Sequence, residues 1–145
     1  MLEEIKNGSD ILAIIVRVSF KDQGIKFFTP DDFSQQLAYM SHPAGKIIDP
    51  HVHNPVRREV HFTKEVLFIR KGKLRVDFYD DSRNYLESRI LDAGDVLLLA
   101  SGGHGFKVIE DIEMFEVKQG PYAGENDKTR FKGIETEGIC IKNGR

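Results

Sequence analysis

Short segments rich in β-branched, aliphatic and aromatic residues recur along most of the chain, and this pattern limits the folds it can adopt. Turn signals such as KDQG, HPAG, RKGK, DDSRN, DAGD, SGGHG and EDIE separate the segments. A helical period lasts for only about one turn, in PDDFSQQL at residues 30–37. The sequence therefore predicts an all-β protein, an antiparallel sandwich or barrel with at most one short helix. The expected strands are residues 11–20, 25–28, 35–41, 46–49, 65–70, 74–79, 85–91, 96–99, 106–109 and 114–117.

Length, charge and cysteine content narrow the class of protein further. A chain of 145 residues predicts one domain, residues 1–145, with the polar segment 120–145 as a strap or tail. The net charge of −2 gives no reason to expect nucleic acid or a membrane surface as partner. The single cysteine, Cys140, excludes an internal disulfide and a cysteine-cluster metal site, and it suits a reducing cytosol. The apolar run ILAIIVRVSF is too short to span a bilayer, so we expect a cytoplasmic protein.

Three histidines and two glutamates collect in IIDPHVHNPVRREVHFTKEVLFIRKG, residues 47–72. If a regular strand runs through DPHVH, His51 and His53 share one face, because alternate side chains point the same way. Glu65 begins the apolar segment EVLFIR, and His104 follows a glycine-rich turn farther along the chain. Three imidazoles and one carboxylate on converging strands are suitable ligands for one divalent ion of iron, zinc, manganese or nickel.

The spacing of these residues resembles that of the cupins, a family of small jelly-roll barrels. The first cupin motif has a glycine, five residues, His-x-His, and later a glutamate followed by six residues and a glycine; the second runs from a glycine to a last histidine. The residues that carry the resemblance are Gly45, His51, His53, Glu65 and Gly72, then Gly94, Gly102 and His104. The resemblance implies a jelly-roll core at about residues 35–119 and metal ligation by His51, His53, Glu65 and His104.

The chain departs from the cupin pattern in two places. Ala100 stands where the second motif usually has a proline, and that turn is one residue shorter. Eleven residues separate His53 from Glu65, where the family usually has three or four. Glu59 is therefore a rival ligand, but no glycine follows it after six residues, so we predict Glu65.

The insertion also supplies candidates for catalysis and substrate binding. On a continuous strand, Glu59 and His61 would lie on the face of Glu65, where either could move a proton; the alternative is a surface hairpin. Arg57 and Arg58 could hold a substrate carboxylate or phosphate, although charged hairpin residues are often only solvated. Tyr39 and Gln35, on an earlier expected strand, are further candidates for substrate contact.

A second, narrower resemblance lies in MFEVKQGPY, residues 114–122, after GGHGFKVIED. These strings are similar to the end of small cupin-fold metalloproteins encoded in bacterial surface-polysaccharide gene clusters. The resemblance implies a sugar or a polar acid as ligand and names no reaction. Glu116 and Lys118 share one strand face, so they enter the cavity or pair on the surface, and the pattern slightly favours the surface.

Three function classes follow from these residues. The first is a metal-dependent enzyme, of isomerase or dioxygenase type, that acts on a small polar metabolite. The second is a metal-free sugar isomerase or epimerase with a histidine base. The third is a small-ligand-binding protein without catalysis. We also expect a homodimer, because Val66 and Phe68 point away from the predicted cavity and need a covering surface.

Overall fold

The computed structural model describes residues 1–142 and contains two compact units. The first unit comprises Met1–Phe20 and the chain from Thr63 onward, and the second comprises Lys21–Phe62. The single domain expected over residues 1–145 stays a prediction, and the last three residues of the expected strap lie outside the described residues. Among residues 1–142, no helix has the length and apolar character needed to cross a membrane.

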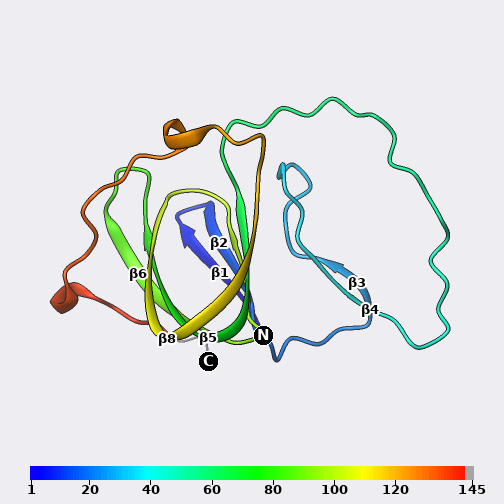
Figure 1. Cartoon of the computed structure of the whole chain (residues 1–145), viewed down its shortest axis with the longest axis horizontal. Helices are drawn as coiled ribbons and strands as arrows, with labels where there is room; N and C mark the ends of the chain where they lie inside the picture. Colours follow the sequence, from blue (N-terminus) through cyan, green and yellow to red (C-terminus); the bar gives the residue numbers. More distant parts are fainter. Residues whose placement is uncertain (143–145) are drawn as a thin grey trace. The chain divides into compact units, whose positions relative to one another are not determined.

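The first unit is one antiparallel sheet that curls strongly (Figure 1). Its strand order is β1-β2-β7-β5-β6. The long strand β5 pairs with β7 through its first half and with β6 through its second half, and β8 pairs with β5 along nearly its whole length. The all-β prediction is confirmed at this level, and within the described residues the only helices are two short 3₁₀ turns, η1 (Gly124–Asp127) and η2 (Thr136–Gly138). The strands are β1 (Leu2–Asn7), β2 (Asp10–Val16), β5 (Glu65–Tyr79), β6 (Tyr85–Asp92), β7 (Val96–Leu99) and β8 (Gly103–Lys118).

Two expected turns are wrong, because RKGK and EDIE are bulges inside long strands. β5 and β8 run through these segments side by side, and their pairing register shifts between residues 69 and 74 of β5. Gly72 has φ 85°, and a Cβ there would lie 2.0 Å from the carbonyl oxygen of Asp111. The bulge bends both strands and changes which alternate residues of β5 face inward. Leu67 and Leu74, seven positions apart, therefore join the same core.

The hydrophobic core of the first unit lies inside the curl of the sheet. Every strand except β8 supplies at least one buried apolar side chain to it, and Ile112 of β8 packs against its margin. The expected strand at residues 96–99 coincides with β7, whereas β1 was not expected from the polar sequence LEEIKN. The core residues are Ile5, Leu12, Ala13, Ile15, Leu67, Ile69, Leu74, Val76, Phe78, Leu91, Leu97 and Leu99.

The second unit is a two-stranded hairpin followed by a long irregular segment. Strands β3 (Gly24–Phe27) and β4 (Ala38–Ser41) pair antiparallel. The short helix expected in residues 30–37 does not form; a turn there is held by the Gln36 amide, which donates to the carbonyl oxygens of Pro30 and Phe33. The strand expected at residues 46–49 is also absent, because residues 46–62 have no regular secondary structure.

The described part of the C-terminal segment returns along the first unit as a strap. The hydroxyl of Tyr79 accepts a hydrogen bond from the amide of Ile134, and that of Tyr85 accepts one from the amide of Cys140. Ile141 then forms a parallel bridge with Ser88 of β6. These contacts attach the strap to the sheet through two tyrosines and one edge strand.

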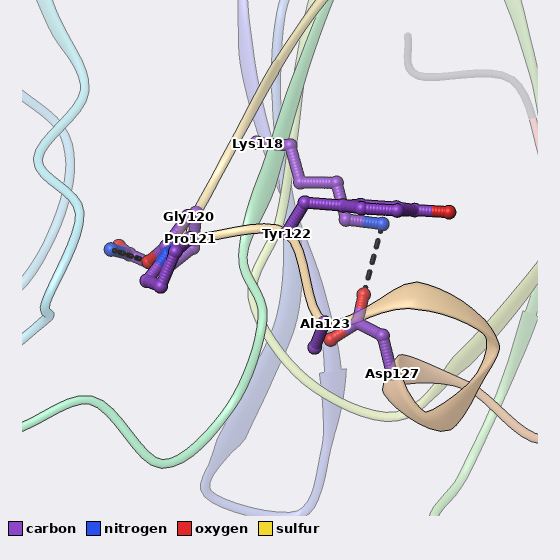
Figure 2. Close-up of a pocket in the computed structure, with 7 residues that line it drawn as sticks. Lys118, Gly120, Pro121, Tyr122, Ala123 and Asp127 are labelled. Carbon is purple, nitrogen blue, oxygen red and sulfur yellow. Dashed lines mark hydrogen bonds and ion pairs between the residues drawn. The ribbon is translucent and has the colours of Figure 1, made fainter.

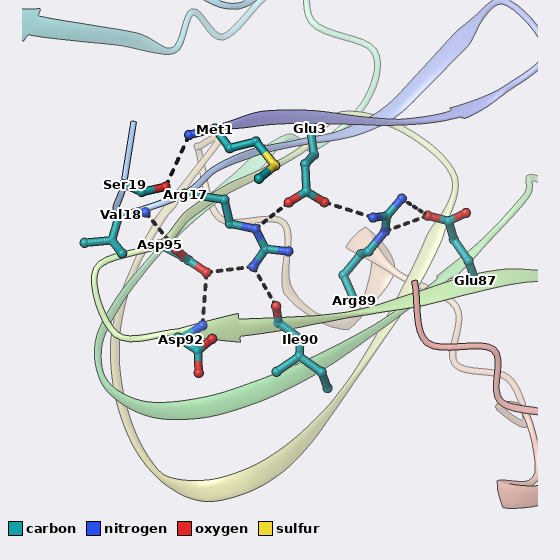
Figure 3. A network of polar contacts seen from close by, with 10 residues as sticks. All are labelled: Met1, Glu3, Arg17, Val18, Ser19, Glu87, Arg89, Ile90, Asp92 and Asp95. Atoms are coloured by element: carbon teal, nitrogen blue, oxygen red, sulfur yellow. Dashed lines mark hydrogen bonds and ion pairs between the residues drawn. The ribbon is translucent and has the colours of Figure 1, made fainter. Parts of the chain in front are cut away.

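A charged network ties β1 and β2 to the β6–β7 turn (Figure 3). The Arg17 guanidinium donates to Glu3, to Asp95 and to the carbonyl oxygen of Ile90. Asp95 also accepts hydrogen bonds from the amides of Val18 and Asp92. Arg89 continues the network from Glu3 to Glu87. The network satisfies charges that would otherwise be costly at this covered corner of the sheet.

Candidate functional site

Glu65 and His104 are distant in the sequence and adjacent in the first unit. The Nε2 atom of His104 lies 3.3 Å from Oε2 of Glu65. Leu99 pairs with Glu65, and Gly103 pairs with Tyr79 at the opposite end of β5. Four residue steps span at most about 14 Å, so the link from Leu99 to Gly103 holds the two ends of β5 together. The curl of the sheet therefore brings two of the predicted ligands into contact.

Glu65 is also in contact with an ammonium group. Lys118 is directly opposite Glu65 in the β5–β8 register, and its Nζ lies 3.1 Å from Oε1 of Glu65. The same Nζ lies 3.0 Å from Oδ2 of Asp127, whose Oδ1 accepts a 2.6 Å hydrogen bond from the Thr63 hydroxyl. The result is a continuous polar chain from His104 through Glu65, Lys118 and Asp127 to Thr63. Below, this set is called the Glu65 chain.

The contacts keep both central groups of the Glu65 chain charged. The hydrogen bond from His104, helped by Lys118 and opposed by burial, lowers the pKa of Glu65 to about 2. Hydrogen bonds to Asp127 and Glu65 raise the pKa of Lys118 well above its usual range. At neutral pH the site therefore holds a carboxylate and an ammonium ion. Lys118 in this state cannot act as an amine nucleophile, which requires the neutral form.

A small cavity adjoins the far end of the Glu65 chain. It has a volume of about 200 Å³ and is lined by Lys118, residues 119–123 and Asp127. Figure 2 shows the Tyr122 ring and the end of the Lys118 side chain above Asp127; all three residues line the cavity. Lys118 therefore contacts Glu65 and lines the cavity at the same time.

The second unit holds the remaining predicted site residues. The rings of His51 and His53 have centroids 5.3 Å apart in an edge-on arrangement. Both side chains are exposed, and Nδ1 of His51 lies 3.0 Å from the carbonyl oxygen of Asp49. Residues 46–62 form no strand. The strand face expected to hold His51 and His53 is therefore absent, and so is the one expected to hold Glu59, His61 and Glu65.

Four other candidates lie in the same unit, together with Glu59 and His61. Glu59 and His61 form an exposed pair at 3.5 Å, and Arg57 and Arg58 are exposed. Tyr39 is half-buried, and Oε1 of Gln35 is buried without a hydrogen-bond partner in the described part of the chain. A buried amide oxygen without a hydrogen-bond donor is unusual and costly. Gln35 therefore stays a candidate for substrate contact, because a ligand could supply the donor.

The contacts of Glu65 and His104 are compatible with metal ligation. A tetrahedral ion with bonds of about 2.0–2.2 Å separates its donor atoms by about 3.3–3.5 Å, which the Glu65–His104 distance fits. Within residues 1–142, no three His, Cys, Asp or Glu side chains are placed together to hold an ion. The four-residue ligand set, with His51 and His53 from the second unit, therefore stays a prediction.

Sequence reasoning assigned less weight to one functional candidate and missed two. For Lys118 the sequence pattern left both the cavity and the surface open and slightly favoured the surface, and Asp127 and Thr63 were not considered. The information that was lacking is the β5–β8 register, because only this pairing places Lys118 opposite Glu65. Comparison with known proteins finds no matching family model, curated protein or solved structure. The cupin resemblance therefore rests on the motif residues alone.

Proposed function

We propose that this chain is a metal-binding protein of the cupin type and an enzyme that acts on a small polar metabolite. The contact between Glu65 and His104 carries the proposal, since the two belong to separate cupin motifs and their donor atoms lie 3.3 Å apart. The curled antiparallel sheet of the first unit supports a jelly-roll assignment. Gly72 supports it too, because the motif glycine occupies a bulge that only a residue without Cβ fits.

The ligand set proposed for the ion is His51, His53, Glu65 and His104. When bound, a divalent iron, zinc, manganese or nickel ion would polarise a carbonyl or carboxylate group of the substrate or bind oxygen. Lys118 holds one oxygen of Glu65 and thereby leaves Oε2 directed to His104. His61 and Glu59, already paired at 3.5 Å, are the proposed proton-transfer groups. Arg57, Arg58, Tyr39 and Gln35 are the proposed substrate contacts.

Metal analysis of protein purified without a histidine tag tests this function. We expect about one divalent transition ion per chain in the wild type and a large loss of bound metal in His104→Ala. His42→Ala is the matched control, because His42 lies outside both motifs and is exposed. Undiminished metal content in His104→Ala, or equal loss in both variants, would contradict the ligand assignment.

One observation favours a second candidate, a ligand-binding protein without metal. The Lys118 ammonium already neutralises Glu65, which is the role that a cation would have. A metal-free isomerase with a histidine base belongs to the same group of alternatives. Wild-type protein that contains no transition metal as purified, in the same metal analysis, would favour this group over the metalloenzyme.

We retain the homodimer as a proposal. Phe68 of β5 and Phe115 of β8 stack with ring centroids 6.5 Å apart, and both are substantially exposed. Val117, next along the same face of β8, is exposed as well. A second copy would cover this apolar surface. Light scattering should give twice the monomer mass for the wild type and a lower mass for Phe115→Ser; a monomeric wild type at micromolar concentration would refute the proposal.

A further inference from the structure

The cavity beside Lys118 has no role in the proposed metal chemistry, and its lining points to a particular kind of ligand. Its volume of about 200 Å³ is below the roughly 300–1,000 Å³ of sites for drug-sized molecules. The space therefore suits one small ring rather than an extended molecule. Its charged lining residues, Lys118 and Asp127, are joined at 3.0 Å.

The charge around the cavity is unfavourable for anions. One ammonium group, that of Lys118, is shared between the carboxylates of Glu65 and Asp127. The set of Glu65, Lys118 and Asp127 therefore has two carboxyl groups for one ammonium group. A phosphate or carboxylate ligand would therefore meet an ammonium group, that of the lining residue Lys118, which is already paired with two carboxyl groups.

The hydrogen-bonding groups of the cavity suit hydroxyl groups instead. An ammonium group has three N–H donors, and the two carboxylates account for two of the contacts of Lys118 in the described residues. Each oxygen of Asp127 accepts one contact, from Thr63 or Lys118, and keeps a further lone pair. A hydroxyl group can accept from the ammonium and donate to the carboxylate, whereas an unprotonated phosphate oxygen can only accept.

An aromatic ring covers the side of the cavity next to these polar groups. Tyr122 is 85% exposed and lines the cavity together with Lys118, and Figure 2 shows its ring on the same side of Asp127 as the Lys118 ammonium group. A flat apolar face next to a few convergent polar groups suits a ring that has C–H groups on its face and hydroxyl groups on its rim. An uncharged polyol ring has this distribution of groups.

We propose that the cavity formed by Lys118, residues 119–123 and Asp127 binds a neutral hydroxylated ring, such as a pyranose, with Tyr122 against the ring face. This inference rests on the proposed function in that it names the substrate class for the same site. Lys118 links the two, because it contacts the predicted ligand Glu65 and lines the cavity. A sugar held here would lie next to Lys118, which contacts the proposed ligand Glu65.

The test uses full-length protein treated with chelator, so that the result does not depend on metal binding. The probes are methyl β-glucopyranoside, methyl β-galactopyranoside and methyl α-mannopyranoside, with methyl β-glucopyranosiduronate as the charged analogue and inorganic phosphate as an anion. Binding is followed by titration with protein-detected NMR. We expect at least one neutral glycoside to saturate a site that includes Tyr122 and to bind about tenfold more tightly than the uronate and phosphate.

Three variants show whether the named residues carry the binding. Tyr122→Ala should weaken the bound glycoside about tenfold, while Tyr122→Phe should retain it, because the ring face remains. Asp127→Asn should reduce the preference for the glycoside over the uronate. Lys132→Met, at an exposed lysine outside the cavity, is the control and should change nothing.

Several results would overturn the inference. It fails if none of the three neutral glycosides saturates, if the uronate or phosphate binds as tightly as the best glycoside, or if Tyr122→Ala binds like the wild type. The exposed position of Tyr122 makes misfolding of its variants a minor concern, and circular dichroism checks it. Metal content, measured separately on untreated protein, decides the proposed function without reference to these outcomes.

Discussion

Two charged networks lie in the first unit and use the same chemistry for different ends. The Arg17 network joins Glu3, Arg17, Asp95, Arg89 and Glu87, whose side chains are only 2–14% exposed. The side chains of Glu65, His104, Lys118 and Asp127 in the Glu65 chain are 13–30% exposed, and two of them line a cavity.

The difference lies in what remains available to a ligand. Arg17 donates to two carboxylates and a backbone carbonyl, and Asp95 accepts from Arg17 and two backbone amides. These bonds join four separate stretches of backbone, so the network acts as an internal crosslink. The Glu65 chain reaches a cavity and retains donor and acceptor capacity there. A charge cluster that only stabilises the fold can therefore be distinguished from one that can bind a ligand. The first has its hydrogen-bonding groups occupied, and the second keeps unused donors and acceptors beside a cavity.

The largest effect is expected from breaking the Arg17 network at Asp95. Asp95→Ala leaves the Arg17 guanidinium and two backbone amides without their acceptor at a site that is 1% exposed. We expect the free energy of unfolding to fall by about 3–5 kcal/mol, measured by urea denaturation. Glu135→Ala, which breaks the exposed Lys132–Glu135 pair, should change it by less than about 1 kcal/mol. A similar small loss at both positions would show that the Arg17 network is not a crosslink.

The next effect concerns the bulge at Gly72, which bends β5 and β8. Gly72→Ala places a Cβ against the Asp111 carbonyl oxygen and retains the unfavourable φ of 85°. Gly45→Ala has the same φ with no atom within 4 Å of the added carbon. We expect Gly45→Ala to cost about 1–2 kcal/mol and Gly72→Ala at least about 2 kcal/mol more, by urea denaturation. Equal costs would mean that the bulge adjusts and does not set the curl.

Glu65 should contribute a smaller, pH-dependent stabilisation in chelator-treated protein. Its folded pKa of about 2 lies below the ordinary value of 4.5, so the folded state favours the carboxylate. The stabilisation is complete above about pH 4.5 and is lost as the pH falls toward 2. We expect the wild type to exceed Glu65→Gln by about 2 kcal/mol at pH 6 in the free energy of unfolding.

The pH series separates this linkage from a general loss of packing. The difference between the wild type and Glu65→Gln should shrink as the pH decreases from 4.5 to 2. Glu59→Gln, at an exposed glutamate, is the control and should follow the wild type throughout. A difference that stays constant or grows on acidification would contradict the assigned contacts of Glu65.

The positions of strands were predicted better from the sequence than the turns and bulges between them. Apolar segments such as Val96–Leu99 identify strands because their residues are β-formers bounded by turn signals. At Gly72 the same reasoning predicted a turn, since a glycine between charged residues is typical of turns and of bulges alike. The choice depends on pairing with Asp111, nearly forty positions away, which local pattern cannot supply.

The candidate site was predictable to a similar extent. Cupin spacing selected Glu65 and His104, and the structure places them in contact. The partners Lys118 and Asp127 have no motif, because their roles come from the β5–β8 register and from the 3₁₀ turn that contains Asp127. The strand expected to carry His51 and His53 was inferred from alternation in only a few residues. Residues 46–62 contain two prolines and many charges, and these residues disfavour a strand.

The smallest expected effect lies at the end of the Arg17 network. Lys142 forms an ion pair with Glu87, and this contact joins the C-terminal strap to β6. Burial raises the pKa of Glu87, but hydrogen bonds from Lys142 and Arg89 outweigh it and lower the pKa overall. The Lys142 side chain is 55% exposed, so solvent screens its charge. Lys142→Met should therefore cost less than about 1 kcal/mol in the free energy of unfolding, by urea denaturation. A cost near that of Asp95→Ala would contradict this expectation and would show that the strap is part of the internal crosslink. The expected small cost means that the crosslink ends at Glu87, whose side chain is 11% exposed.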